Sequence, residues 1–286
     1  MTAGLLLLLK VSVGLLILAI GMGSTFSDLA YLWRRPGLLV RSLLAMYVLV
    51  PLAALVLVTL LPLAPPIKAA LLVLAVSAGA PLLPRKLGAF ESDAYVFSLV
   101  VTSSVLAVVL VPAWVSLLGE HFGMAMEISP VTVAEAIAKA FLLPLAAGMV
   151  LRLLWPSWAQ RWSDTLLAAA GIVLMACGVL MLATHYELLL LAHWWGFAAL
   201  VALMLAALAI GHLLGGPTAD DRTALAIACA TRHVGIAVLV ATSFPGPRTA
   251  VLIAAYVVAS AAVSIPYLKW RRTKAAALGA ARVSGT

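Results

Sequence analysis

The chain has 286 residues, of which 65% are hydrophobic and only 10% are charged, and its mean hydropathy is +1.18. A water-soluble core of this length does not need so much apolar sequence, so an all-α polytopic membrane protein is expected. The net charge of +8 does not indicate nucleic acid as a partner, because the basic residues form no stripe beside aromatic stacking positions.

Nine segments are apolar and long enough to cross a bilayer, which takes about 20 residues. In chain order they cover residues 3–21, 37–62, 66–84, 93–118, 132–153, 164–184, 188–214, 222–243 and 248–268. The first has no basic residues before its apolar run, so we expect a retained helix rather than a signal peptide. A short interfacial helix is expected over 27–35, with Asp28 near its start.

The third span, residues 66–84, ends in prolines and charges. Pro81 and Pro84 lack an amide hydrogen and interrupt helical hydrogen bonding, and Arg85 and Lys86 follow directly. Broken backbone at membrane depth is tolerated where it lines a cavity or is buried in protein. Two interpretations of the Arg-Lys pair stay open: it binds a ligand, or it extends to the cytoplasmic interface near acidic residues.

The eighth span, residues 222–243, carries a second break. Small residues such as Ala228 precede Thr231, Arg232 and His233. This motif resembles the end of the third span, and corresponding breaks in two halves of a chain indicate the binding site of a transporter. Because equivalent spans are five positions apart, the copies enter the membrane from opposite sides. The sequence therefore predicts inverted repeats and alternating access.

These copies divide a single membrane domain, residues 1–286. The predicted parts are a first repeat over about 1–118, a linking helix over 132–153, a second repeat over 164–268 and a cytoplasmic tail over 269–286, the last dozen residues of which are expected to be frayed. Within the linking helix, Glu135 and Lys139 are spaced i and i+4, which predicts a local ion pair.

The basic residues sort by membrane side. Nine spans place the termini on opposite faces, and cytoplasmic loops carry the excess of Lys and Arg. The basic residues on the C-terminal side are Arg34, Arg35, Arg41, Arg152, Arg161, Arg222, Lys269, Arg271, Arg272, Lys274 and Arg282. The other side has little beyond Lys68 and Arg248. The sequence predicts a protein of the cell (inner) membrane with its N-terminus outside and its C-terminus in the cytoplasm.

Several motifs follow one another in a fixed order along the chain. They are Gly21-Met22-Gly23, Phe26, Asp28, Arg34-Arg35-Pro36, Pro51, Ala80-Pro81, Asp93, Thr102-Ser103-Ser104, Leu143-Pro144, Gly148, Arg152 and residues 230–237. In order and spacing these motifs resemble the bile acid:sodium symporter family, also called the sodium/bile acid cotransporter family. The resemblance covers essentially the whole chain, which looks like the nine-helix form that lacks the first of ten helices.

The resemblance implies a fold and a substrate class. The family fold has a core domain, in which two discontinuous helices cross near the membrane centre, and a panel domain that moves against it. Here the third and eighth spans would be the crossing pair. The family moves organic anions, including bile acids and small carboxylates, usually with sodium, and half-helix N-termini near the crossing favour an anionic group.

The chain departs from the family at its sodium ligands. Typical members use a Glu and, four residues later, a Gln on the second crossing helix, and aligning the motifs places Ala228 and Arg232 there. The Ser-Asn pair of the first crossing helix falls near Leu83-Pro84, and the chain contains no Asn. The ligands that remain are backbone carbonyls and hydroxyls such as those of Thr102, Ser103, Ser104 and Thr231. These departures argue against conventional two-sodium coupling, so sodium stays an open question, and no other cofactor or metal is expected.

We interpret Arg232, together with Arg85, as a fixed cation that stands where sodium would bind. It either holds the core rigid or contacts an anionic substrate, because its planar fork suits a carboxylate. His233 either carries a coupled proton or bonds to backbone beside the break. The candidate substrate- or ion-binding residues are Pro84, Arg85, Lys86, Thr102, Ser103, Ser104, Ala228, Thr231, Arg232 and His233.

Other functional classes lack their signatures. An enzyme would need a nucleophile with a base or a metal cluster, and the sequence has no Gly-x-Ser-x-Gly elbow or His-rich spacing. An arsenite exporter would be expected to place Cys where Leu82 stands. The alternative to a sodium symporter is a proton-coupled or uncoupled organic-anion carrier. The expected partners are a small organic anion and the lipid bilayer, and the sequence defines no oligomeric state.

Overall fold

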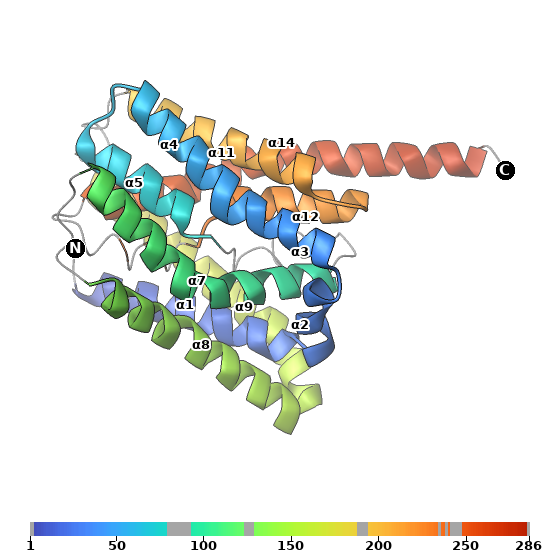
Figure 1. Cartoon of the computed structure of the whole chain (residues 1–286). Helices are drawn as coiled ribbons and strands as arrows, with labels where there is room; N and C mark the ends of the chain where they lie inside the picture. The colour runs from blue at the N-terminus through green and yellow to red at the C-terminus, as the bar shows by residue number, and fades with distance from the viewer. Residues whose placement is uncertain are drawn as a thin grey trace.

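The computed structural model describes residues 3–78, 93–122, 129–187, 194–233, 236–237, 240 and 248–284. Within these ranges every regular element is a helix, and no strand occurs (Figure 1). The elements are α1 (Ala3–Gly23), α2 (Phe26–Trp33), α3 (Pro36–Leu44), the π-helical η1 (Ala45–Leu49), α4 (Val50–Leu60), α5 (Pro65–Val76), α7 (Asp93–Phe122), α8 (Pro130–Leu154), α9 (Pro156–Thr184), α11 (Trp194–Leu214), α12 (Ala219–Ala230) and α14 (Arg248–Ser284). The predicted all-helical fold class is confirmed for the described part of the chain.

The described residues contain fewer membrane-spanning helices than the nine that the sequence predicts. Six helices are long and apolar enough to cross a membrane, and a seventh is added if α1 and α2, which meet at a bend of 91°, count as one span. α5 is apolar but shorter. The count of nine spans and the inverted repeats therefore stay predictions.

Local sequence explains where several helices begin. Pro36, Pro65, Pro130 and Pro156 each stand at the start of a helix, where the missing amide hydrogen costs nothing. Thr218 and Asp221 form a capping box. Because of these signals, α9 and α12 begin several residues before the ranges predicted from hydropathy. The tail was predicted to be frayed and is instead helical, because α14 continues to Ser284.

Three helices form one packed group at the bottom of Figure 1, namely α1, α8 and α9. Gly21 of α1 lies directly against Gly148 of α8. A Cβ atom on either glycine would overlap the backbone of the other helix, at the carbonyl oxygens of Leu145 and Leu18 respectively. The absence of side chains at these two positions is what allows the helices to touch backbone to backbone.

The second group contains the α3–η1–α4 helix, α5, α11, α12 and α14. It lies above the first group in Figure 1, and α9 of the first group packs against α14 of the second. α7 joins them, because it packs against α2 and α8 on one side and against α5 on the other. Glycine again permits close approach, since a Cβ on Gly211 of α11 would come within 2.5 Å of the Ala226 Cα atom in α12.

The first broken helix ends earlier than the prolines suggest. α5 ends at Val76, and Ser77 and Ala78 are non-helical. The predicted break at residues 81–84 and the candidate residues Pro84, Arg85 and Lys86 lie outside the described residues. The backbone therefore leaves the helix before any proline is reached.

Candidate functional site

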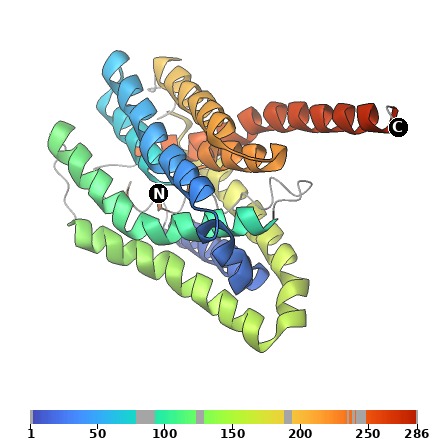
Figure 2. The same cartoon turned by 45° about the vertical axis from the view of Figure 1, so that its right-hand side comes forward.

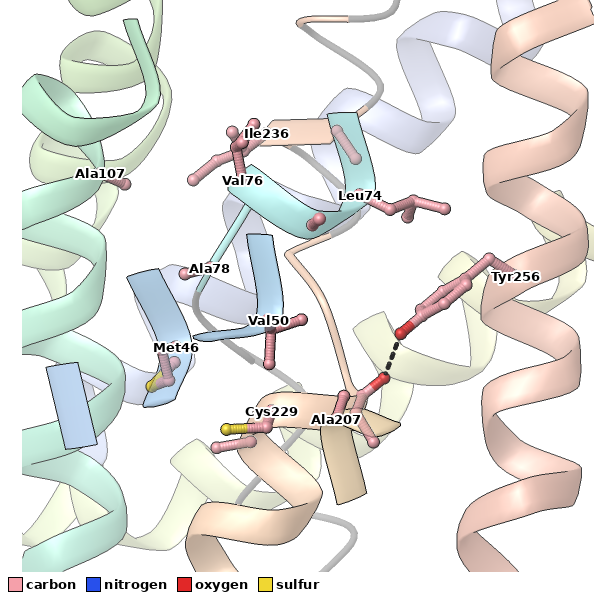
Figure 3. Close-up of a cluster of buried hydrophobic side chains, with 14 of the residues drawn as sticks. Met46, Val50, Leu74, Val76, Ala78, Ala107, Ala207, Cys229, Ile236 and Tyr256 are labelled. Atoms are coloured by element: carbon pink, nitrogen blue, oxygen red, sulfur yellow. Dashed lines mark hydrogen bonds between the residues drawn. The ribbon is translucent and has the colours of Figure 1, made fainter. Parts of the chain in front are cut away.

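The two helix breaks meet through their backbones. α12 ends at Ala230, and Thr231 has extended backbone angles. Residues 236 and 237 are helical again, and the Ala237 amide donates to the His233 carbonyl at 2.9 Å. The His233 amide donates to the Ser77 carbonyl oxygen at 3.0 Å. Figure 3 shows buried apolar side chains of this region, among them Val76 and Ala78 from the first break and Ile236 from beyond the second. Two chain segments far apart in sequence are thus joined where neither is helical.

Arg232 lies in the second break and is buried, with 1% of its surface exposed. Its Nη1 donates to the Met46 carbonyl oxygen at 3.4 Å. Among the described residues, Nε and Nη2 have no hydrogen-bond partner. The Tyr256 hydroxyl lies beside the Arg232 guanidinium, near hydrogen-bonding distance, and Tyr47 is close enough to interact with its charge. A permanent positive charge is therefore held inside the helix bundle.

The Met46 carbonyl can accept this bond because of a defect in its own helix. Over η1 the bonding pattern widens, so the Val50 amide donates to the Ala45 carbonyl, five residues back. The next residue, Pro51, has no amide hydrogen to donate to the following carbonyls. Two carbonyls at this point bond outside the helix: Met46 accepts from Arg232 at 3.4 Å, and Tyr47 accepts from the Trp114 indole of α7 at 2.9 Å.

His233 points away from Arg232. In an extended segment successive side chains project to opposite faces. Accordingly Arg232 contacts the α3–η1–α4 helix, whereas the His233 ring meets the Phe141 ring of α8 edge to face, with centroids 4.1 Å apart. His233 is fully buried, and its two ring nitrogens have no hydrogen-bond partner among the described residues. The two residues predicted to form one site therefore face different helix groups.

The predicted hydroxyl ligands on α7 are buried but are already engaged with their own helix. Ser103 and Ser104 both donate to the Val100 carbonyl, at 3.0 and 2.7 Å. The Tyr47 hydroxyl donates to the Ser103 carbonyl, which connects this part of α7 to η1. Thr102 is buried nearby in sequence.

The two candidates on α12 and at its end are buried as well. Ala228 brings no polar side chain to the site, and Thr231 is buried beside Arg232 in the chain. The Tyr256 hydroxyl of α14 donates to the Ala230 carbonyl at 2.7 Å, the bond that is drawn in Figure 3. This bond satisfies one of the carbonyls that the end of a helix leaves without a partner.

A family model, the Sodium Bile acid symporter family, matches residues 10–192 of the chain. The chain belongs to this family. The predicted resemblance is thereby confirmed, and with the apolar helices it makes the chain a multi-pass membrane protein of a transporter family. Comparison with curated proteins gives no significant match. The matched range ends before Arg232, so the second break lies beyond it.

Sequence reasoning missed several partners of this symporter-family site: Ser77, Met46, Trp114 and Phe141. Pro51 was a usable signal for the freed carbonyls, because a proline inside a membrane span leaves acceptors behind it. Nothing in the local sequence marks the other contacts, which join residues from distant helices. Within the described ranges, no three His, Cys, Asp or Glu side chains gather as a metal site requires.

Proposed function

We propose that this protein is a secondary transporter that moves an organic anion, bile-acid-like or a small carboxylate, across the cytoplasmic membrane by alternating access. Membership in the sodium bile acid symporter family supports the class of protein. The negative charge of the substrate is inferred from Arg232, which is buried at the meeting point of the two helix breaks. A fixed cation inside a membrane protein attracts anions and repels cations.

In this proposal the two helix groups move against each other. The group of α1, α8 and α9 is the panel, and the group that contains α5, α12 and their neighbours is the core. α5 and α12 are the crossing pair of an inverted repeat with nine spans, and His233 meets the panel at Phe141. Alternating access then requires that this contact open on one side of the membrane at a time.

Arg232 also bears on ion coupling. By resemblance to the family it occupies the position of a sodium-binding Gln, and it donates to a backbone carbonyl, the kind of oxygen that sodium would use. Two unit charges about 4 Å apart repel by roughly 4 kcal/mol at an intermediate dielectric, so sodium would not bind beside it. This contact favours a sodium-independent carrier, proton-coupled or uncoupled, over a sodium symporter.

The proposed orientation follows the basic residues. We place the C-terminus and the exposed Lys269, Arg272 and Lys274 of α14 in the cytoplasm and the N-terminus outside the inner membrane. The oligomeric state does not enter the proposal.

Uptake by proteoliposomes tests the function. We expect labelled small carboxylates or bile salts to enter equally well in sodium and in choline buffers. Arg232→Ala should abolish uptake while the yield of folded, monodisperse protein stays close to that of the wild type. Arg152→Ala, at a half-buried arginine at the end of α8 that donates to the Pro156 carbonyl, is the matched control and should transport normally.

Two results would contradict parts of the proposal separately. Uptake that needs sodium would show that hydroxyls and carbonyls still build an ion site, and would refute replacement of sodium by Arg232. Unchanged uptake by Arg232→Ala would remove Arg232 from transport altogether.

A further inference from the structure

The guanidinium of Arg232 is used on one side only. Nη1 donates to the Met46 carbonyl, whereas Nε and Nη2 have no partner among the described residues. Nε–H and the adjacent Nη2–H point the same way and form one edge of the planar group, the edge that donates two parallel hydrogen bonds to a carboxylate. Nε and Nη2 therefore form together one bidentate hydrogen-bond donor.

Burial makes this unused edge costly. Arg232 is 1% exposed, and a buried charge is tolerated when it is paired and hydrogen-bonded. A carbonyl oxygen accepts a bond but does not cancel the charge. Among the side chains that the structure describes, no carboxylate forms an ion pair with Arg232; the ion pair found there joins Lys139 and Glu135 on the exposed face of α8. The charge and the hydrogen bonds both call for an anion.

The orientation of the edge is set by the protein. Pro51 and the π-helical turn free the Met46 carbonyl, which holds Nη1. The Arg232 backbone lies in the break, where the neighbouring His233 amide is bonded to Ser77. The guanidinium is thus fixed at both ends of its side chain, and a preorganised donor loses little freedom when it binds a ligand.

We propose that the Nε/Nη2 edge of Arg232 binds the carboxylate of the transported anion through two parallel hydrogen bonds, and that Met46 and Pro51 are positioning residues for this edge. This inference rests on the proposed function and adds the geometry of recognition to it. The site takes an oxyanion with two oxygens side by side. A primary amide lacks the charge, and a halide lacks the second acceptor.

Thermal unfolding of the purified full-length protein tests the inference without transport, since a ligand that binds the folded state raises its stability. The probes are cholate and 2-oxobutyrate, each compared with its primary amide, and chloride, an anion without a second acceptor atom. The variants are Arg232→Lys, which keeps the charge and loses the fork, and Pro51→Ala, which restores an amide hydrogen near the Met46 carbonyl. Arg271→Lys, at an arginine bonded to Thr223 and Ala219 instead, is the matched control.

We expect a carboxylate to stabilise the wild type and Arg271→Lys equally, and the amides and chloride to have little effect. Arg232→Lys should weaken carboxylate binding about tenfold or more, the loss expected for one charge-assisted hydrogen bond. Pro51→Ala should weaken it less while its unfolding temperature without ligand stays near that of the wild type.

Equal carboxylate binding by Arg232→Lys and wild type would overturn the bidentate edge, and so would stabilisation of the wild type by chloride as large as that by carboxylate. Either result is compatible with anion uptake by proteoliposomes, so it would refute this inference and leave the proposed function standing. Absence of uptake together with selective carboxylate binding would do the reverse.

Discussion

The α1–α8 contact and the meeting of the two helix breaks are built in opposite ways. Gly21 and Gly148 bring two regular helices together backbone to backbone, with no room for even a methyl group. At the breaks, single hydrogen bonds join Ser77 to His233 and Arg232 to Met46, and several buried polar atoms have no partner among the described residues. The glycine contact allows only one arrangement of the two helices. The breaks contain unbonded Arg232 nitrogens, which can form new hydrogen bonds. Close packing fixes a structure, and unused hydrogen bonds allow it to respond to a ligand.

The glycine contact should show the largest effect on stability. Gly148→Ala places a methyl group against the Leu18 carbonyl and the Met22 amide, so α1 and α8 must move apart. We expect a loss of about 1–3 kcal/mol, the usual range for overpacking, measured as a lower unfolding temperature in detergent. The control is Gly14→Ala, in the same helix α1 as Gly21, where the added methyl group meets nothing within 4 Å. Equal unfolding temperatures for the two variants would show that the helices are not in backbone contact.

The hydrogen bonds around the breaks should be worth less. Tyr256→Phe removes the bond from α14 to the Ala230 carbonyl and keeps the ring. A single net hydrogen bond contributes about 1 kcal/mol, so a small drop in unfolding temperature is expected. Because this hydroxyl bonds to the end of α12 and lies beside the Arg232 guanidinium, the variant should also bind carboxylates more weakly. A loss of stability as large as that of Gly148→Ala would show that this region is as rigid as the glycine contact.

The exposed ion pair of α8 should have the smallest effect. Lys139 and Glu135 lie 3.3 Å apart with 71% and 62% of their side chains exposed, as the i and i+4 spacing predicted. Exposed pairs of this kind contribute about 0.3–0.5 kcal/mol. Lys139→Ala should leave the unfolding temperature and carboxylate binding almost unchanged, which separates the buried contacts of α8 from its surface. A clear loss of binding would mean that this face of α8 belongs to the site.

Much of the fold follows from the sequence because every segment that crosses a bilayer must be a long run of apolar residues. The apolar runs predicted the helices of the described ranges to within a few residues at most ends, and the family resemblance is confirmed by the family model. The errors fall where local signals outweigh hydropathy. The Thr218 capping box and Pro156 begin helices earlier than hydropathy alone indicates, and α5 ends at Val76 although the prolines come later, at positions 81 and 84.

The candidate site was predictable in part for the same reason. A cation and a histidine after a run of small residues are unusual in a membrane span, so Arg232 and His233 stood out from their local sequence. Their partners did not, because Met46 precedes Arg232 by 186 positions and the Phe141 contact depends on how α8 packs. The opposite directions of the two side chains follow from extended backbone, which hydropathy cannot detect.

α14 is much longer than a bilayer crossing requires, so a small tilt of the helix moves its C-terminal end by a large distance. The helix has 37 residues, so it is about 55 Å long, whereas the apolar part of a bilayer is about 30 Å thick. In Figures 1 and 2 its C-terminal part extends well beyond the other helices. Tyr256 ties the same helix to the end of α12. A tilt of about 5° around Tyr256 would displace the Ser284 end by about 4 Å. A probe attached near this end would therefore magnify a movement that begins beside the buried arginine.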